Sequence, residues 1–161
     1  MSQLSLSPNI TTLERPSRWK IWLALSSPVL LLGLAFGYLK YSQQKYLPIV
    51  MAVTNVFHAR LAGGEDSLIY READPAWKAA LSEDAEQKFF SRIRRKLGAC
   101  SYSGPLRMFF NANTNGTFVT VVYGAHCTNA AMKETFTWRI LDGRRASLMK
   151  YRPNSPVLLR D

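Results

Sequence analysis

The longest run without a charged residue lies near the start of the chain, over residues 21–39, and it constrains the fold more than any other feature. As an α-helix this run would be about 28 Å long, close to the roughly 30 Å of a bilayer's hydrocarbon core. Aromatic side chains and a lysine stand at each border, within 19–22 and 38–41, as is usual where a helix crosses the lipid headgroups. The pattern predicts a transmembrane helix over 19–41.

The segments beside this run predict how the chain is anchored. Residues 1–18 are rich in Ser and Thr and have no apolar period, which indicates a flexible tail. A cleaved signal peptide is the alternative, but its apolar part would be shorter, whereas this run continues into Lys40. More basic residues precede the run than follow it closely, which favours a cytoplasmic N-terminus. We expect a single-pass signal anchor in the cell inner membrane, with the C-terminal domain periplasmic or otherwise extracytoplasmic.

Net charge indicates the kind of partner. The chain of 161 residues has a formal net charge of +10, and most of that excess lies beyond residue 20. The part after the predicted span has the usual size of one domain. A basic domain beside a bilayer attracts anionic lipid headgroups or an acidic envelope protein more readily than nucleic acid. We therefore expect the membrane bilayer and one of these two counterparts as partners, and no nucleic acid.

Apolar periodicity and capping residues predict the helices that follow. Apolar residues recur at helical spacing over 47–62, and two glycines end that run. Asp74 followed by Pro75 is typical of a capped helix start, with Trp77 as its apolar anchor. A stronger helix is predicted over 82–97, with Ser as its cap, acidic residues in its first turn and basic residues in its last.

Period-two alternation predicts four strands in two hairpins, over 106–112, 117–125, 133–140 and 146–152. Asn-Gly and Asp-Gly at the turns favour tight two-residue loops. Such loops predict Phe110 opposite Val121 in the first hairpin and Phe136 opposite Met149 in the second. The fold class is therefore α+β: an N-terminal transmembrane helix, then a domain over 47–155 with a four-stranded antiparallel sheet and helices packed on one face. Residues 156–161 are expected to form a C-terminal tail.

Several short motifs occur in this order along residues 68–155. A Ser-capped helix ends in Leu-Gly, a strand begins with Glu-Thr, and an Asp-Gly turn leads to Tyr and then Asn-Ser. In these features the chain resembles the small bacterial membrane-anchored NTF2-like or cystatin-like domains. The resemblance implies an envelope protein whose curved sheet forms a pocket or docks a partner. Membrane-anchored NTF2-like domains are also similar to periplasmic assembly components of secretion and conjugation machines.

Two cysteines, Cys100 and Cys127, are candidates for a disulfide. Both lie in the soluble part and none lies in the tail, as expected in an oxidising compartment. Two buried free thiols are the alternative. Neither cysteine belongs to a pattern with metal-ligand spacing, and no phosphate-binding glycine loop is present. We expect no metal and no cofactor.

Aromatic and acidic side chains on the strands are candidates for a ligand pocket. An isomerase of the NTF2 type would need a carboxylate base beside acidic donors, and Glu134 with Tyr123 and Tyr151 is the set that could supply them. The alternative is that the tyrosines fill the sheet face and Glu134 forms an ion pair. The candidate pocket residues are Tyr123, Glu134, Phe136, Trp138, Met149 and Tyr151.

Basic residues cluster at the end of the 82–97 helix and along the last hairpin. They are candidates for a patch that binds lipid headgroups or an acidic partner. A solvated helix end is the alternative interpretation. The candidate residues are Arg92, Arg94, Arg95, Lys96, Arg144, Arg145, Lys150 and Arg152.

The sequence thus favours a membrane-tethered, non-catalytic interaction or assembly module of the cell envelope. The alternative is an NTF2-like domain whose pocket binds an apolar small molecule or a lipid.

Overall fold

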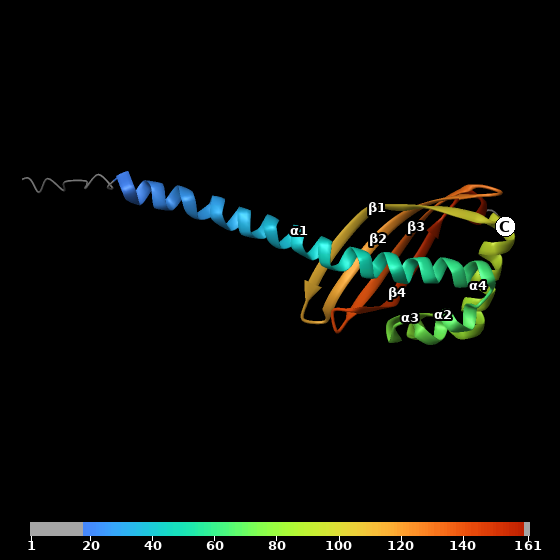
Figure 1. The fold of residues 1–161 in the computed structure, drawn as a ribbon. Helices are drawn as coiled ribbons and strands as arrows, with labels where there is room; N and C mark the ends of the chain where they lie inside the picture. Colours follow the sequence, from blue (N-terminus) through green and yellow to red (C-terminus); the bar gives the residue numbers. More distant parts are fainter. Residues whose placement is uncertain (1–17, 160–161) are drawn as a thin grey trace, which may run out of the picture. The chain divides into compact units, whose positions relative to one another are not determined.

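The computed structural model describes residues 18–159, and the chain divides into two compact units, Met1–Tyr38 and Leu39–Asp161 (Figure 1). It is an α+β chain in which helices precede an antiparallel sheet. The helices are α1 (Arg18–Gly63), α2 (Asp66–Glu72), α3 (Pro75–Ala80), α4 (Glu83–Leu97) and the short 3-10 helix η1 (Pro156–Leu158). The strands are β1 (Cys100–Asn113), β2 (Gly116–Cys127), β3 (Ala131–Leu141) and β4 (Arg145–Asn154).

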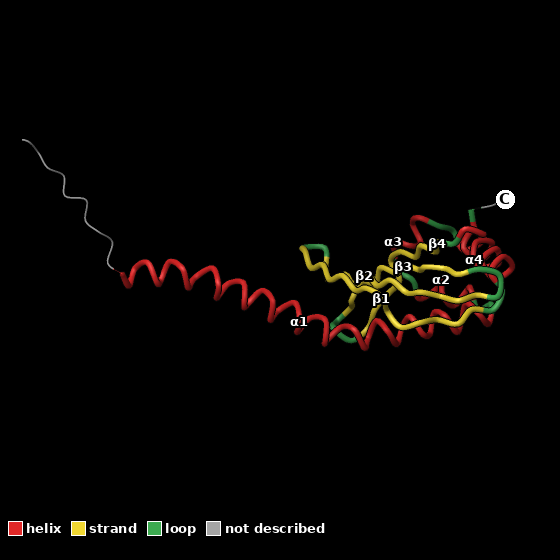
Figure 2. Tube along the Cα trace, turned by 90° about the horizontal axis from the view of Figure 1, so that it is seen from above, coloured by secondary structure: helices red, strands yellow, loops and turns green. Residues whose placement is uncertain are grey.

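Helix α1 is continuous where the sequence predicts two helices, over 19–41 and 47–62. Among the described residues, no helix combines the length and apolar character that a membrane crossing requires. Residues 1–17 of the predicted tail and most side chains of the predicted span lie outside the described residues. From Tyr46 onward, α1 lies along the strands and supplies Val50, Phe57 and Leu61 to the core (Figure 2).

Local sequence explains where the shorter helices begin and end. The carboxylate of Asp74 accepts the backbone N–H of Ala76 at 2.9 Å, and Pro75 needs no such partner at the first helical position. Ser82 caps α4 through the N–H of Ala85. Gly98 ends α4 with φ at +74°, a conformation that costs glycine little. The predicted helix starts at these two caps are confirmed.

The four strands form an antiparallel meander in the order β1-β2-β3-β4, as predicted, but the predicted registers are wrong. In the first hairpin Phe110 pairs with Val119, because Asn113 pairs directly with Gly116 and the loop is one residue earlier than Asn-Gly predicts. Bulges near Pro105 then bring Cys100 opposite Cys127.

The second hairpin also departs from the Asp-Gly prediction. Leu141 pairs with Arg145, and a register shift follows between Thr137 and Trp138. Phe136 therefore faces Tyr151, while Met149 is the extra residue of the bulge. A bulge adds one residue to one strand and cannot be counted from turn chemistry alone.

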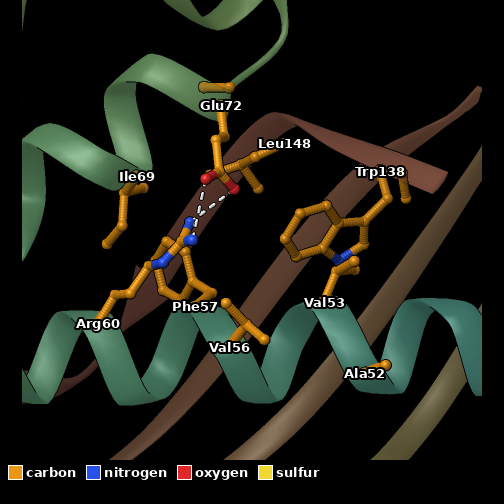
Figure 3. A pocket seen from close by; sticks show the side chains of 11 residues that line it. Ala52, Val53, Val56, Phe57, Arg60, Ile69, Glu72, Trp138 and Leu148 are labelled. Carbon is orange, nitrogen blue, oxygen red and sulfur yellow. Dashed lines mark hydrogen bonds and ion pairs between the residues drawn. The ribbon is translucent and has the colours of Figure 1, made fainter.

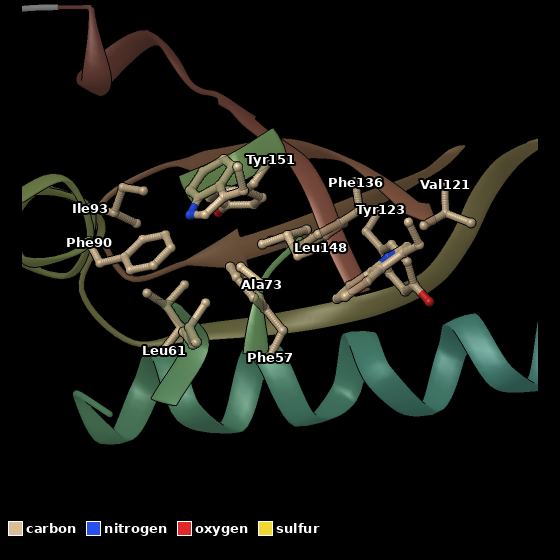
Figure 4. Close-up of a cluster of buried hydrophobic side chains, with 14 of the residues drawn as sticks. Phe57, Leu61, Ala73, Phe90, Ile93, Val121, Tyr123, Phe136, Leu148 and Tyr151 are labelled. Carbon is tan, nitrogen blue, oxygen red and sulfur yellow. The ribbon is translucent and has the colours of Figure 1, made fainter. Parts of the chain in front are cut away.

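Aromatic side chains from α1, α4, β3 and β4 fill the space between the helices and the sheet (Figure 4). The ring of Phe57 on α1 lies 5.7 Å from Phe90 on α4, 5.1 Å from Phe136 and 4.9 Å from Tyr151, centroid to centroid. Such edge-to-face and tilted arrangements are favourable for aromatic pairs. Val121, Tyr123 and Leu148 complete the inner face of the sheet, which the helices cover.

Candidate functional site

The sheet has a second face, which we call the outer face and define by Arg107, Phe109, Val122, Thr137 and Lys150. Successive strand residues point to opposite sides, so these residues are opposite in orientation to the buried Val119, Val121 and Phe136. Phe109 is 56% exposed, which is unusual for an aromatic side chain in the middle of a strand. The outer face therefore has both apolar and polar side chains at its surface.

Pairing across the strands orders these side chains into rows. One row runs from Arg107 through Val122 and Thr135 to Arg152, and the next runs from Phe109 to Lys150. Three strand spacings separate the two ends of a row, roughly 14 Å. Cations thus stand at both ends of the first row, and the second row has Phe109 at one end and Lys150 at the other.

The charge of the outer face has one sign. Arg107, Lys133, Lys150 and Arg152 are all exposed there. The only acidic residue within the described strands is Glu134, whose side chain points to the inner face and has no exposed surface. This surface consequently attracts acidic groups.

One further cation near this face is already neutralised. The Nε of Arg139 lies 3.2 Å from a carboxylate oxygen of Asp74, and its guanidinium stacks over the Phe118 ring at 5.5 Å. Asp74 also accepts the hydroxyl of Ser147 at 3.0 Å. Arg139 therefore ties α3 to the sheet, and we do not count it among the cations available to a partner.

A buried polar cluster lies on the inner face, around Glu134. One carboxylate oxygen lies 2.8 Å from Nε2 of His58 on α1, and the other accepts the Tyr151 hydroxyl at 2.5 Å. The ring of Tyr102 stacks on His58 at 3.5 Å between centroids. His58 is 5% exposed and Glu134 is 0% exposed, so a substrate could not touch this carboxylate in the observed conformation.

Burial raises the pKa of each phenol around this cluster. It raises the pKa of Tyr102 to about 12, with the charge of Glu134 adding to the effect. The pKa of Tyr151 is raised well above its ordinary value, first by burial and then by the same carboxylate. Burial also raises the pKa of Tyr123. These phenols therefore remain protonated at physiological pH, and in that state Tyr151 donates its hydroxyl hydrogen to Glu134.

A second buried carboxylate lies at the start of α4. Oε1 of Glu86 accepts the indole N–H of Trp77 at 2.7 Å, while Oε2 has no hydrogen-bond partner among residues 18–159. Burial raises the pKa of Glu86 to about 7. The loss of solvation raises this pKa more than the hydrogen bond from Trp77 lowers it. Glu86 therefore titrates near neutral pH.

Five of the six predicted pocket residues lie together on the inner face, within the packed core. Met149, the sixth, lines a hollow of about 620 Å³ with Thr120, Thr137 and Arg139 on the outer face. The sequence placed it wrongly because of the bulge in β4. Of the five, Trp138 alone lines the apolar pocket that the structure contains beside α1.

That pocket lies between α1, α2 and the strands β3 and β4, and has a volume of about 360 Å³ (Figure 3). Apart from one ion pair its lining is apolar, with Val53, Val56 and Leu148 among its walls. The ion pair joins Arg60 to both carboxylate oxygens of Glu72, at 2.7 and 2.9 Å, and lowers the pKa of Glu72. The two charges at its edge therefore satisfy each other.

The structure does not gather the predicted basic patch into one surface. Arg94 forms a bidentate pair with Asp66, at 2.6 and 2.7 Å, and Arg145 pairs with Asp142 in the β3–β4 turn. The remaining six residues divide among four places. Arg144 lies in that turn and Lys150 on the outer face, Arg95 and Lys96 lie on α4, and Arg92 and Arg152 line a common hollow between α4 and β4.

The predicted disulfide is confirmed, since Cys100 and Cys127 are bonded. It joins the start of β1 to the end of β2, beside the C-terminus of α4. There the backbone N–H of Thr128 donates to Ala99 at 2.9 Å and that of Asn129 to Leu97 at 3.1 Å. The disulfide thus reinforces the junction between helix and sheet.

Three buried polar residues, His58, Asp66 and Glu86, stand in no local pattern that predicts a structural role. His58 and Glu134 are separated by 76 positions, and no local pattern links them. Glu86 has the appearance of one more acidic residue in a helix's first turn. The one available signal was helical spacing, since Glu86 precedes the buried Phe90 and Ile93 by four and seven positions.

Comparisons with protein families, with curated proteins and with solved structures find no match to this chain. They identify no family, so functional inference rests on the site itself.

Proposed function

We propose that this protein is a membrane-tethered, non-catalytic interaction module of the cell envelope, whose outer face docks an acidic surface of a partner protein. The observation that carries the proposal is the uncovered face with four exposed cations and no carboxylate from its strands. Catalysis is disfavoured by the burial of Glu134 within paired side chains.

The composition of the outer face supports a protein rather than a lipid as its counterpart. Lipid headgroups would engage the cations alone, whereas exposed Phe109 and half-buried Val122 beside the cations also need apolar contact. Rows that each mix polar and apolar side chains fit an acidic protein surface with its own apolar residues. The cations would speed the encounter and select acidic partners.

The tether is supported by the uncharged run over 21–39 and its aromatic borders. Within the first unit, Leu30, Leu31 and Leu34 are each more than 60% exposed, which is unfavourable in water and favourable in lipid. We propose a cytoplasmic N-terminus and an extracytoplasmic domain, in keeping with the disulfide. The helix-then-meander order likewise supports an NTF2-like or cystatin-like domain.

Photocrosslinking in the cell that produces the protein tests the docking face. p-Benzoylphenylalanine replaces Phe109 on the outer face or, as a positional control, Val56, which is 47% exposed on α1. We expect the Phe109 position to yield a protein adduct that the Val56 position does not. Arg107→Glu with Lys150→Glu should reduce that adduct at least tenfold, because two attractive pairs become repulsive.

Arg144→Glu with Arg95→Glu is the matched control, since it also reverses two charges at exposed positions, and both lie outside the outer face. Replacing acidic residues of the captured protein with basic ones should restore the adduct with the variant that carries Arg107→Glu and Lys150→Glu. Equal adducts from both positions, indifference to charge reversal, or an adduct with lipid in place of protein would each refute the docking proposal.

Extraction of membranes with alkaline carbonate tests the tether separately. We expect the full chain to remain with the lipid fraction and its N-terminus to remain intact. A chain that is released, or whose first residue lies beyond Leu39, would refute the tether and leave the docking face untouched.

The pocket beside α1 favours a second candidate function, the binding of an uncharged apolar small molecule. Its volume of about 360 Å³ is within the range of ligand sites. Because Arg60 and Glu72 already neutralise each other, the pocket offers no unpaired charge to a ligand. Ala52→Phe, at an exposed position in its wall, should abolish such binding without disturbing the core.

A further inference from the structure

A separate hollow lies between α4, the end of β4 and η1, and it has a volume of about 340 Å³. Its apolar lining includes Phe89 and Ile93 from α4 and Leu158 and Leu159 near the C-terminus. Leu159 is 81% exposed, so a strongly apolar rim stands in solvent. These elements are distant in sequence, and only the tertiary fold creates the hollow.

Two arginines from different elements stand at this apolar hollow. Arg92 projects from α4 and Arg152 from β4, and both are exposed. No acidic residue is among the described residues that line the hollow. A guanidinium has five N–H donors in a planar fork, so it can bind a carboxylate or phosphate oxygen in addition to another partner.

We propose that this hollow binds an anionic amphiphile, with its acid group at Arg92 and Arg152 and its hydrocarbon chain against Phe89, Ile93 and Leu158. Apolar walls alone would accept any hydrocarbon, and the two cations select one that ends in a negative charge. At about 30 Å³ for each water-sized group, 340 Å³ holds on the order of ten carbon-sized groups. This matches a medium acyl chain.

The site does not depend on the docking function proposed above. Arg92 and the apolar lining lie outside the outer face, and only Arg152 is shared. The acid group could come from a free fatty acid or from an anionic lipid of the bilayer, since both present the same chemistry to the arginines.

Binding of labelled decanoate to the full chain, reconstituted in nanodiscs of zwitterionic phosphatidylcholine, tests the proposal. Protein-free nanodiscs give the background from partition into lipid. We expect saturable binding above that background, and at least tenfold weaker binding of decanol, which has the same chain and no charge. Hexanoate should bind more weakly than decanoate, by up to roughly fourfold for each methylene removed.

Variants locate the acid group. Arg152→Gln and Arg92→Gln should each weaken decanoate binding about tenfold, because a charge-assisted hydrogen bond is lost. Arg95→Gln is the matched control, since Arg95 is exposed on the same helix and does not line this hollow. Thermal unfolding of each variant checks that the fold is retained. If Arg92→Gln lowers stability, the decanoate affinity of Arg152→Gln decides the test by itself.

Replacing a third of the lipid with phosphatidylglycerol distinguishes the two sources. Competition with decanoate identifies the bilayer lipid as the ligand, whereas unchanged decanoate affinity identifies a free acid, and both results support the site. The proposal is overturned if decanol binds as tightly as decanoate, if both arginine variants bind normally, or if Arg95→Gln weakens binding equally.

Discussion

Glu86 should make the stability of this domain depend on pH near neutrality. The pKa of this buried carboxyl is about 7 in the folded protein, whereas the ordinary value is 4.5. The folded state therefore holds the proton more tightly than the unfolded state does, so stability falls as pH rises from 4.5 to 7. Below pH 4.5 Glu86 does not reduce the free energy of unfolding, and above pH 7 it reduces it by the full amount.

The structure sets the size of this effect. At about 1.4 kcal/mol for each pKa unit, the difference between 4.5 and about 7 corresponds to about 3 kcal/mol. Glu86→Gln removes the charge and keeps an oxygen that can accept the Trp77 N–H. The variant should match the wild type near pH 4.5 and exceed it by up to about 3 kcal/mol at pH 8, which corresponds to a rise of about 10 °C in Tm.

Thermal unfolding of the full chain in nanodiscs, followed by near-ultraviolet circular dichroism from pH 4.5 to pH 8, measures this difference. Asp84→Asn is the control, because it removes an exposed carboxylate from the same helix turn. A stability gain that is constant with pH, or that is largest at pH 4.5, would show that burial of Glu86 does not govern its protonation.

Three other substitutions test the packing that supports the proposed surfaces. Cys100→Ser with Cys127→Ser should lower the free energy of unfolding by about 3 to 4 kcal/mol under oxidising conditions, and reductant should remove the difference from wild type. Glu134→Ala should cost about 3 to 5 kcal/mol, because it leaves His58 and a buried phenol without their partner; pairing it with His58→Ala in a double-mutant cycle should recover part of that loss. Gly98→Ala should cost about 1 to 2 kcal/mol in chemical denaturation, since φ is +74° and the added methyl would lie 3.0 Å from a neighbouring side chain; a cost near zero would refute the argument from conformation.

Local patterns were sufficient to predict most helices and strands after residue 46. Asp74 and Ser82 begin helices because their side-chain oxygens replace the missing backbone partners, an effect that acts over three residues. Alternation of apolar and polar residues predicted the four strands and their meander, because side-chain direction alternates between neighbouring residues of a strand and is therefore also a local property. For the cysteines the sequence left a disulfide and two free thiols as alternatives, and the bulges near Pro105 that bring them opposite each other are a feature of the tertiary structure.

The register of the strands could not be obtained in this way. The bulge that contains Met149 adds one residue to β4, and a shift of one residue reverses the face of every later side chain. Turn residues predict a loop length, but packing of Phe136 against Tyr151 and Phe57 selects which loop and bulge the chain adopts. For this reason Met149 lies on the outer face, apart from the other five candidate pocket residues.

By itself, the sequence determined the uncharged run, the basic excess and the order of helices and strands, because each depends on residues that are neighbours in the chain. Tertiary structure alone decided that His58 reaches Glu134, that Glu86 is buried, and that Arg92 and Arg152 meet at one hollow. Those contacts join distant segments, and they form only where the packing of the whole core offsets the entropy lost in bringing the segments together.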